Sequence, residues 1–380
     1  MKTKQPKTIL TLIIGTLLGI GFANAVAASD SSMQDNYDKL WGSAKLYDSK
    51  DNEFIQKLAF TGRLQYDYAY VNEDDQQSWD DTAWRRARAG FKATVFQKFT
   101  AHVELNLDPE NTDPVYDGIT DAYIGWKTGN DLSIKLGKQS AGFTLDGSTS
   151  SKRIITTERG SLSNNFWFTR EYFFGATASG ENETWSYKVG LFSNDRSDEI
   201  ENVGEEGFFL LLSAGKDFGS SLNVDKASLR VDFVYNDESD GRLGTNALET
   251  ILSINGQYDN GPWHLWGDLS FAESFSGDSQ WGLQIMPFYD INDTFQVVAS
   301  YNYLSSSEDN GLRLNRYERR AYGGGRGDRL QDLYIGLNTY FYGHKLKWQN
   351  GFTFTDMKDS ADDGGEFSGY GFTSAIRLYW

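Results

Sequence analysis

The chain of 380 residues contains no cysteine, only three histidines and only five prolines. The absence of cysteine excludes a disulfide scaffold, a cysteine protease and zinc-finger or iron–sulfur sites. So few histidines argue against a His-rich metal centre. The 53 acidic residues outnumber the 36 basic ones, for a formal net charge of −17, which argues against a general nucleic-acid binder. We therefore expect no cofactor and no nucleic-acid partner.

Long apolar runs are also missing after the N-terminus, and the mean hydropathy of −0.54 argues against a helical membrane protein. Residues 1–28 are the exception. They begin with lysines, continue with an apolar stretch from Ile9 to Ile20 and end on small residues around Ala27. This pattern predicts a signal peptide and therefore export. A short membrane anchor is the alternative, but the stretch is shorter than the roughly 20 residues of a spanning helix.

Aromatic residues are abundant, at 15% of the chain, and they recur in short segments that alternate apolar and polar residues. From Leu58 to Tyr70 the even positions are mostly large and apolar, whereas Arg63 and Asp67 occupy odd positions. A period of two indicates a strand with one apolar and one polar face. About sixteen such segments follow one another, and many have the length of roughly ten residues with which a tilted strand crosses a bilayer.

The sequence therefore predicts an all-β fold, a transmembrane antiparallel β-barrel of about 16 strands over residues 58–380. A soluble β-sandwich would have shorter strands and no aromatic residues gathered at strand ends. Residues 29–57 are polar and are predicted to form a short periplasmic or plug-like segment before the barrel. The expected location is the bacterial outer membrane, in contact with its lipid and lipopolysaccharide.

The final segment alternates up to Trp380, with Phe372, Ile376 and Leu378 on one face. It is similar to the last strand of bacterial outer-membrane barrels, which ends on an aromatic residue. This resemblance implies that the barrel-insertion machinery is a partner through the Trp380 strand.

Because lipid-facing positions must be apolar, the opposite positions should line the lumen. Basic residues outnumber acidic ones at these positions, and basic rings in a pore select anions. The planar donor fork of arginine suits phosphate. The strand candidates for pore lining and anion binding are Arg63, Arg86, Arg88, Lys92, Lys135, Arg230 and Lys347. The alternative is that basic and acidic wall residues pair and leave a weakly selective pore.

Residues 139–170 form the longest stretch without alternation after the first strand, and a connection of this length usually has a function. The stretch follows the fifth predicted strand, so it is expected to be the third external loop, the one that folds inward and constricts the pore in porins. Its basic residues complete the set of candidates: Lys152, Arg153, Arg159 and Arg170. A second basic loop lies at 311–329.

Several stretches are similar to the phosphate-selective porin O/P family. They are residues 85–92, 121–124, 136–139, 149–159 and 336–340. The resemblance implies a homotrimer of 16-stranded barrels, each with a constricting loop and with basic residues that guide phosphate or polyphosphate. Matched onto this chain, the family's pattern assigns that role to Arg86, Arg88, Lys152, Arg153 and Arg159.

The function predicted from the sequence is that of an outer-membrane porin, in which small anions, phosphate or polyphosphate, diffuse passively through a basic lumen. A general or sugar-conducting porin with weak ion selectivity is the alternative, since Tyr123 and Trp266 also have inward parity and could stack sugars. An enzyme is not expected. A barrel lipase needs a serine beside a histidine, and none of the three histidines lies in a recognisable serine motif.

Overall fold

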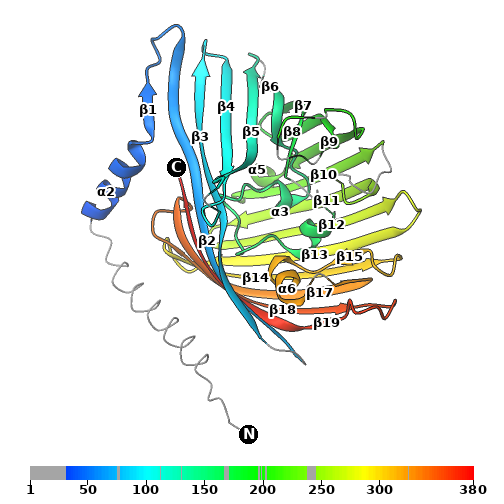
Figure 1. Ribbon diagram of the computed structural model, residues 1–380. Helices are drawn as coiled ribbons and strands as arrows, with labels where there is room; N and C mark the ends of the chain where they lie inside the picture. Colours follow the sequence, from blue (N-terminus) through cyan, green and yellow to red (C-terminus); the bar gives the residue numbers. More distant parts are fainter. Residues whose placement is uncertain are drawn as a thin grey trace.

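The computed structural model describes residues 31–74, 78–111, 113–129, 131–166, 171–195, 197, 199–201, 203–237, 245–323 and 325–380. The predicted signal peptide and Arg170 lie outside the described residues. Sixteen strands of the described chain close into one antiparallel barrel, which confirms the predicted fold class (Figure 1). They are β2 Ile55–Glu73, β3 Trp79–Val95, β4 Phe99–Leu107, β5 Tyr116–Lys127, β6 Leu132–Ser140, β7 Tyr172–Glu181, β8 Trp185–Ser193, β9 Phe208–Asp217, β10 Lys226–Asn236, β11 Leu248–Asn260, β12 Trp263–Ser274, β13 Ser279–Asp290, β14 Phe295–Ser306, β17 Arg329–Tyr340, β18 Leu346–Lys358 and β19 Phe367–Tyr379.

Each barrel strand pairs with its neighbours in the sequence, except that β14 pairs directly with β17. Between these two strands the chain makes a small hairpin of β15 Leu312–Arg313 and β16 Arg326–Gly327, with helix α6 Arg316–Tyr322 inside it. The barrel closes where β19 pairs with β2, in a register that runs from Gly369 opposite Glu73 to Tyr379 opposite Arg63. Closure leaves these strands no free edge, which a barrel in lipid requires.

Short turns and longer connections alternate along the barrel, so each kind gathers at one end. The short-turn end holds turns such as residues 96–98, 261–262 and 291–294. The long-loop end holds the connection after β6, with helices α3 Leu145–Ser148 and α4 Ser161–Phe166, and the connection after β14. A further short helix, α5 Gly219–Leu222, belongs to the turn between β9 and β10.

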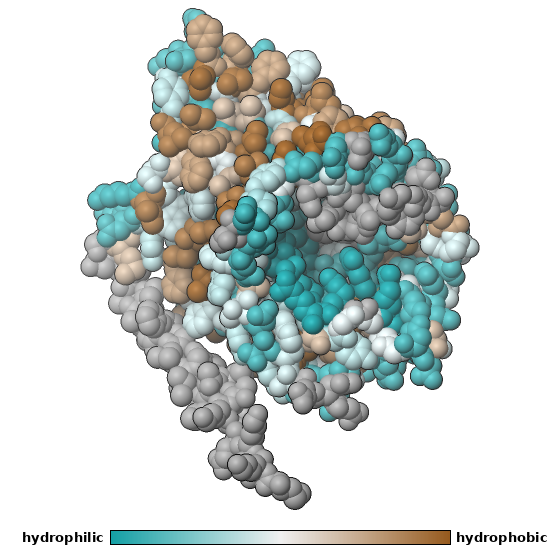
Figure 2. Space-filling view, viewed as in Figure 1, coloured by the Kyte–Doolittle hydropathy of each residue, from teal (hydrophilic) through white to brown (hydrophobic). Residues whose placement is uncertain are grey.

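The two faces of the strands differ as the alternation predicts. In β2, Arg63, Gln65 and Asp67 are each at most 5% exposed, whereas the intervening Tyr66 is 40% exposed. Figure 2 shows hydrophobic residues gathered on the outside of the N-terminal strands and hydrophilic residues lining the hollow. The outer residues with large exposed apolar side chains include Phe91, Ile124, Leu136, Leu191, Val231, Ile254, Ile285, Leu333, Phe354 and Ile376. A polar interior and an apolar exterior suit a barrel whose outside contacts lipid.

Residues before the barrel form helix α2 Ser31–Gly42 and strand β1 Lys45–Asp48, and β1 pairs with the first residues of β2. Helix α2 lies outside the sheet in Figure 1. The Trp41 indole nitrogen donates to the Tyr379 carbonyl at 2.6 Å, and the Tyr342 hydroxyl donates to Asp38. These contacts hold α2 at the short-turn end. That residues 29–57 are periplasmic or plug-like stays a prediction.

The last residue packs against the first barrel strand. The Trp380 ring stacks on Phe60 with ring centroids 5.5 Å apart. It also covers Gly62, where an added Cβ would lie 2.5 Å from the indole ring. A glycine at this position therefore lets the terminal aromatic residue lie flat on β2.

None of the described helices is long and apolar enough to span a bilayer.

Candidate functional site

The connection between β6 and β7 lies against the inner wall of the barrel. Arg63 and Gln65 of β2 donate to Ser151, at 2.6 Å to its hydroxyl and 2.8 Å to its carbonyl. Beyond the intervening strand β19, Gln349 of β18 donates to the Ile155 carbonyl at 2.8 Å. Residues 141–166 of this connection are called the inner segment below. Inward-facing wall side chains thus bond to backbone carbonyls of the segment, as a buried irregular segment requires.

Several wall cations, among them the predicted Arg230 and Lys347, hold the inner segment in place. Lys347 of β18 is fully buried and donates to the Ile154 carbonyl. Lys188 of β8 donates to the Gly142 carbonyl at 3.2 Å and also to Ala141. Arg230 of β10 donates to the Thr144 carbonyl at 2.8 Å and pairs with Asp232 at 2.8 Å. These wall cations are therefore engaged by the protein itself.

An apolar cluster holds both ends of the inner segment. Phe143, Leu162 and Phe166 of the segment belong to the same buried cluster as three wall phenylalanines. The wall residues are Phe173 of β7, Phe192 of β8 and Phe209 of β9. Fully burying a side chain of this size contributes roughly 2 kcal/mol, so the cluster fixes the two ends of the segment independently of the ion pairs at its middle.

A β-bulge in β3 turns two consecutive arginines toward the interior. In the pairing of β2 with β3, Gln65 lies opposite Arg86 and Tyr66 lies opposite Trp84, so Arg85 has no opposite residue. Arg86 donates to Gln65 at 2.9 Å. Arg85 makes a two-point contact with Glu158 of the inner segment, and one of its bonds measures 2.9 Å. Strict alternation had placed Arg86 inside and missed Arg85. The signal was three arginines within four residues, which one face of a regular strand cannot hold.

The charge of Glu158 is maintained by its partner. Burial opposes ionisation, but the bonded Arg85 guanidinium, with Arg86 and Arg316 nearby, holds the pKa of Glu158 well below its usual range. Arg159 instead binds its own segment, donating to the Thr149 carbonyl at 2.7 Å and lying 3.4 Å from Glu171. Burial opposes ionisation of Glu171 as well, yet Arg159 and other arginines lower its pKa to about 2. Both carboxylates are therefore charged at neutral pH.

Lys92, Lys135 and Lys152 are less engaged. Lys92 of β3 is exposed, and Lys135 of β6 lies 5.1 Å from the centre of the Tyr123 ring. No carboxylate of the described residues lies within 4.0 Å of either ammonium group. The Lys152 side chain is 20% exposed and lies 5.3 Å from the centre of the Tyr379 ring. These three lysines come from the β3–β6 side of the wall and the adjacent part of the inner segment, and we call them the lumen lysines.

The remaining predicted pore-lining residues lie in different parts of the barrel. Arg63 and Arg88 lie beside the lumen lysines but are buried, with Arg88 donating to the Tyr172 hydroxyl at 2.6 Å. Arg153 is exposed and lines a cavity of about 620 Å³ between α2 and the short-turn end. Arg230 and Lys347 belong to other parts of the wall, where they hold the inner segment.

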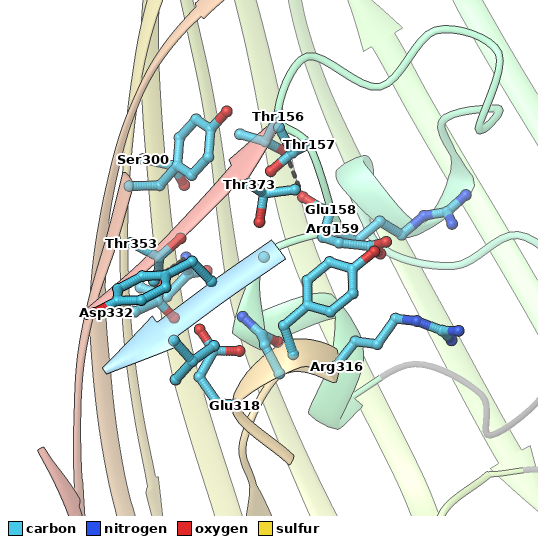
Figure 3. A pocket seen from close by; sticks show the side chains of 18 residues that line it. Thr156, Thr157, Glu158, Arg159, Ser300, Arg316, Glu318, Asp332, Thr353 and Thr373 are labelled. Carbon is cyan, nitrogen blue, oxygen red and sulfur yellow. Dashed lines mark hydrogen bonds between the residues drawn. The ribbon is translucent and has the colours of Figure 1, made fainter. Parts of the chain in front are cut away.

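The second basic loop also turns inward, toward the inner segment. Tyr317 of α6 donates to Asp67 of β2 at 2.6 Å, and Arg313 donates to the Asn164 carbonyl at 2.6 Å. In Figure 3, residues 156–159 face Arg316 and Glu318 across a cavity of about 40 Å³. The two connections thus support each other. At the edge of this cavity, burial and the nearby Asp332 raise the pKa of Glu318 to about 7, although its own backbone N–H and Arg319 oppose this.

Comparison with known proteins agrees with this architecture. Residues 58–207 match the family of phosphate-selective porins O and P. Porin O of Pseudomonas aeruginosa is 27% identical over 254 residues, which cover 62% of this chain and 56% of Porin O. The chain resembles the phosphate-selective porins O and P, as its sequence motifs predicted. The match spans little more than half the length of Porin O.

Solved porin structures share the fold at low sequence identity. The anion-selective porin from Comamonas acidovorans has a TM-score of 0.60 at 12% identity, covering 85% of this chain and 99% of that porin. OmpT of Vibrio cholerae has a TM-score of 0.57 at 14% identity, covering 87% and 99%. The channel DcaP of Acinetobacter baumannii has a TM-score of 0.57 at 12% identity, covering 88% and 100%. These structures show that the barrel has the porin fold. Together with the family match and the likeness to Porin O, this fold indicates a bacterial outer-membrane protein.

Proposed function

We propose that the chain is an outer-membrane porin through which small anions diffuse passively, with phosphate as the preferred solute. The observation that carries the proposal is the set of lumen lysines, Lys92, Lys135 and Lys152. Their side chains are exposed or partly exposed, whereas other wall cations such as Lys188, Arg230 and Lys347 donate to carbonyls of the inner segment. Cationic groups in a narrow, low-dielectric channel concentrate anions and exclude cations. The match to the phosphate-selective porins supports phosphate among the small anions.

The inner segment is the proposed constriction. It is attached to distant strands at Leu145, whose N–H donates to Asp268 of β12 at 2.9 Å, and at Thr157, whose carbonyl accepts from Arg377 of β19 at 2.9 Å. A segment fixed to several different strands would narrow the lumen without moving. It would also present Lys152 and Arg153 to a passing solute. We propose Arg63, Arg86, Arg88 and Arg159 as positioning residues of this constriction, since each bonds to wall or segment groups.

Export and assembly follow from the same proposal. Residues 1–28 would be removed after export, and β19 with its terminal Trp380 would be recognised by the barrel-insertion machinery. The apolar outer face would then contact lipid and, on the outside of the cell, lipopolysaccharide. We propose a homotrimer, because the family resemblance implies one and OmpT of Vibrio cholerae has been solved in a trimer form.

Phosphate block of chloride current tests the proposed solute. The purified protein is inserted into a planar bilayer in KCl, and inorganic phosphate is added stepwise. We expect phosphate to reduce the chloride current at concentrations far below that of chloride, because a slowly released dianion occupies the lumen lysines. An oligosaccharide added in the same way should leave the current unchanged. Block by the oligosaccharide without block by phosphate would support the sugar-conducting alternative and contradict the proposal.

A further inference from the structure

Three cations surround one buried carboxylate on the inner wall. Glu104 of β4 is 0% exposed. Its Oε1 atom lies 2.6 Å from Nη2 of Arg63 and 3.9 Å from Nη1 of Arg88. Its Oε2 atom lies 4.0 Å from Nζ of Lys152 and accepts no hydrogen bond from the described residues. The carboxylate thus occupies the centre of a cationic cluster, where an external anion would otherwise be drawn.

The three cations differ in what else they bind. Arg63 also donates to Ser151 and Arg88 to Tyr172, so both guanidinium groups are oriented by protein partners. At 4.0 Å the Lys152 ammonium is too far from Glu104 for a hydrogen bond, and its side chain is 20% exposed. Lys152 can therefore turn its protons toward the lumen, with the Glu104 charge behind it.

We propose that Glu104 is a specificity-determining residue, a built-in counter-anion that holds Lys152 in position and lowers the affinity of the channel for the anions that pass it. The proposal rests on the proposed function, because Lys152 meets a solute only if anions travel through the lumen. Conduction requires binding that is favourable enough for a solute to enter and weak enough for it to leave. A fixed negative charge behind the cation supplies this balance, since it repels the same anion that Lys152 attracts.

The size of the effect follows from Coulomb's law. A solute in contact with Lys152 would lie several ångströms beyond it, at roughly 7 Å from the Glu104 carboxylate. At that distance the repulsion between two unit negative charges is still large at an effective dielectric constant of about 20. Removing that charge should strengthen anion binding by about tenfold or more. Neutralising an acid elsewhere on the chain should have no such effect, because distant exposed charges are screened by salt.

The test is the variant Glu104→Gln, which keeps the shape of the side chain and an acceptor for Arg63. Inorganic phosphate is titrated against the chloride current of the intact protein in a planar bilayer, at a pH low enough for Lys152 to stay charged in both proteins. The apparent affinity for phosphate should rise about tenfold. The matched control is Glu308→Gln in the connection after β14, where Glu308 is exposed. It makes the same change in net charge and should leave the affinity as in the wild type.

A pH profile separates this role from a merely structural one. Burial and the neighbouring Arg63 lower the pKa of Lys152 to about 8, against the opposing effect of Glu104. Lys152 is charged below its pKa and loses the charge above it. Without Glu104 that pKa falls further, so the loss of chloride selectivity in a KCl gradient should begin at a lower pH than in the wild type. The charged and titratable groups near Lys152 are Glu104, Arg63, Lys92, Asp121, Arg88, His102 and Tyr379.

Two further variants keep the test decisive. In a Lys152→Gln background, Glu104→Gln should give much less than its gain in the wild type, because a solute stays near Glu104 only where Lys152 attracts it. If Glu104→Gln does not fold, Glu104→Asp takes its place. It keeps the negative charge but moves it away from Lys152, so the gain in phosphate affinity should be smaller. Unchanged phosphate affinity together with an unchanged pH profile, in variants that conduct anions, would overturn the inference. A wild-type protein that conducts no anions would overturn the proposed function instead.

Discussion

Replacing Lys92 and Lys135 together by glutamate is expected to turn the proposed anion-selective channel into a cation-selective one. In the described structure neither ammonium group has a carboxylate within 4.0 Å, so both charges act on the lumen directly. Reversing both places acidic groups on the wall beside the inner segment, where the low dielectric strengthens their field. The chloride-to-potassium permeability ratio should fall by more than about tenfold. The measurement is the reversal potential in a KCl gradient.

The matched control for this charge reversal is Lys39→Glu with Lys50→Glu. Both lysines are exposed on the segment before the barrel, so the variant has the same net charge without altering the wall. We expect its reversal potential to stay close to that of the wild type. If the wall variant and the control shift the potential equally, net charge and not the lumen lysines determines selectivity.

The second large effect is expected from Arg85→Ala, which removes the partner of Glu158. Both side chains are less than a fifth exposed, so the variant leaves a carboxylate largely buried and uncompensated. Breaking such a pair from one side costs about 3–5 kcal/mol. The inner segment should then detach locally, and the single-channel conductance should rise while anion selectivity falls. Conductance histograms and thermal unfolding of the detergent-solubilised barrel measure both consequences.

Two comparison variants define the outcome of that experiment. The double variant Arg85→Ala with Glu158→Ala leaves no unpaired charge and should recover most of the lost stability. Arg320→Ala breaks an exposed ion pair in which Arg320 and Asp81 lie 4.0 Å apart. Because exposed pairs contribute only about 0–1 kcal/mol, this variant should lose little stability. Wild-type conductance in Arg85→Ala would mean that the inner segment does not depend on this ion pair.

Alternation was enough to predict the barrel, because each lipid-crossing strand must present apolar residues to one side. It placed Arg63, Arg86 and Lys347 on the inner wall, where the structure has them. The predicted start of the barrel at residue 58 falls within β2, which begins at Ile55. Of the three residues before the predicted start only Ile55 is apolar, and one apolar residue is too few for the alternation to mark the true beginning.

The pairing of the wall cations could not be predicted from one sequence. Parity gives the face of a residue but not the carboxylate that it meets. Arg63 of β2 reaches Glu104 of β4 across an intervening strand, and Arg377 meets Asp67 only because the two ends of the barrel close on each other. The sequence count of inward basic residues therefore overstates the charge available to a solute. Lys347 and Arg377 face inward, yet both serve to hold residues 154–157.

The path of the inner segment was predicted only in outline. Its length and lack of alternation marked it as a functional loop, but no periodic pattern places an irregular segment. The bulge at Arg85 was a further obstacle, because one extra residue reverses the faces of the strand beyond it. Ala83, on the far side of the bulge, is accordingly 4% exposed and inward although simple alternation from Arg86 would turn it outward.

The central claim is that the lumen selects anions, and the reversal potential of the wild-type channel in a KCl gradient tests it most directly. Measured across a planar bilayer near neutral pH, the potential should lie close to the equilibrium potential of chloride, because the lumen lysines exclude potassium. A potential close to that of potassium would contradict the account. The acidic loops, and not the inner wall, would then control which ions pass.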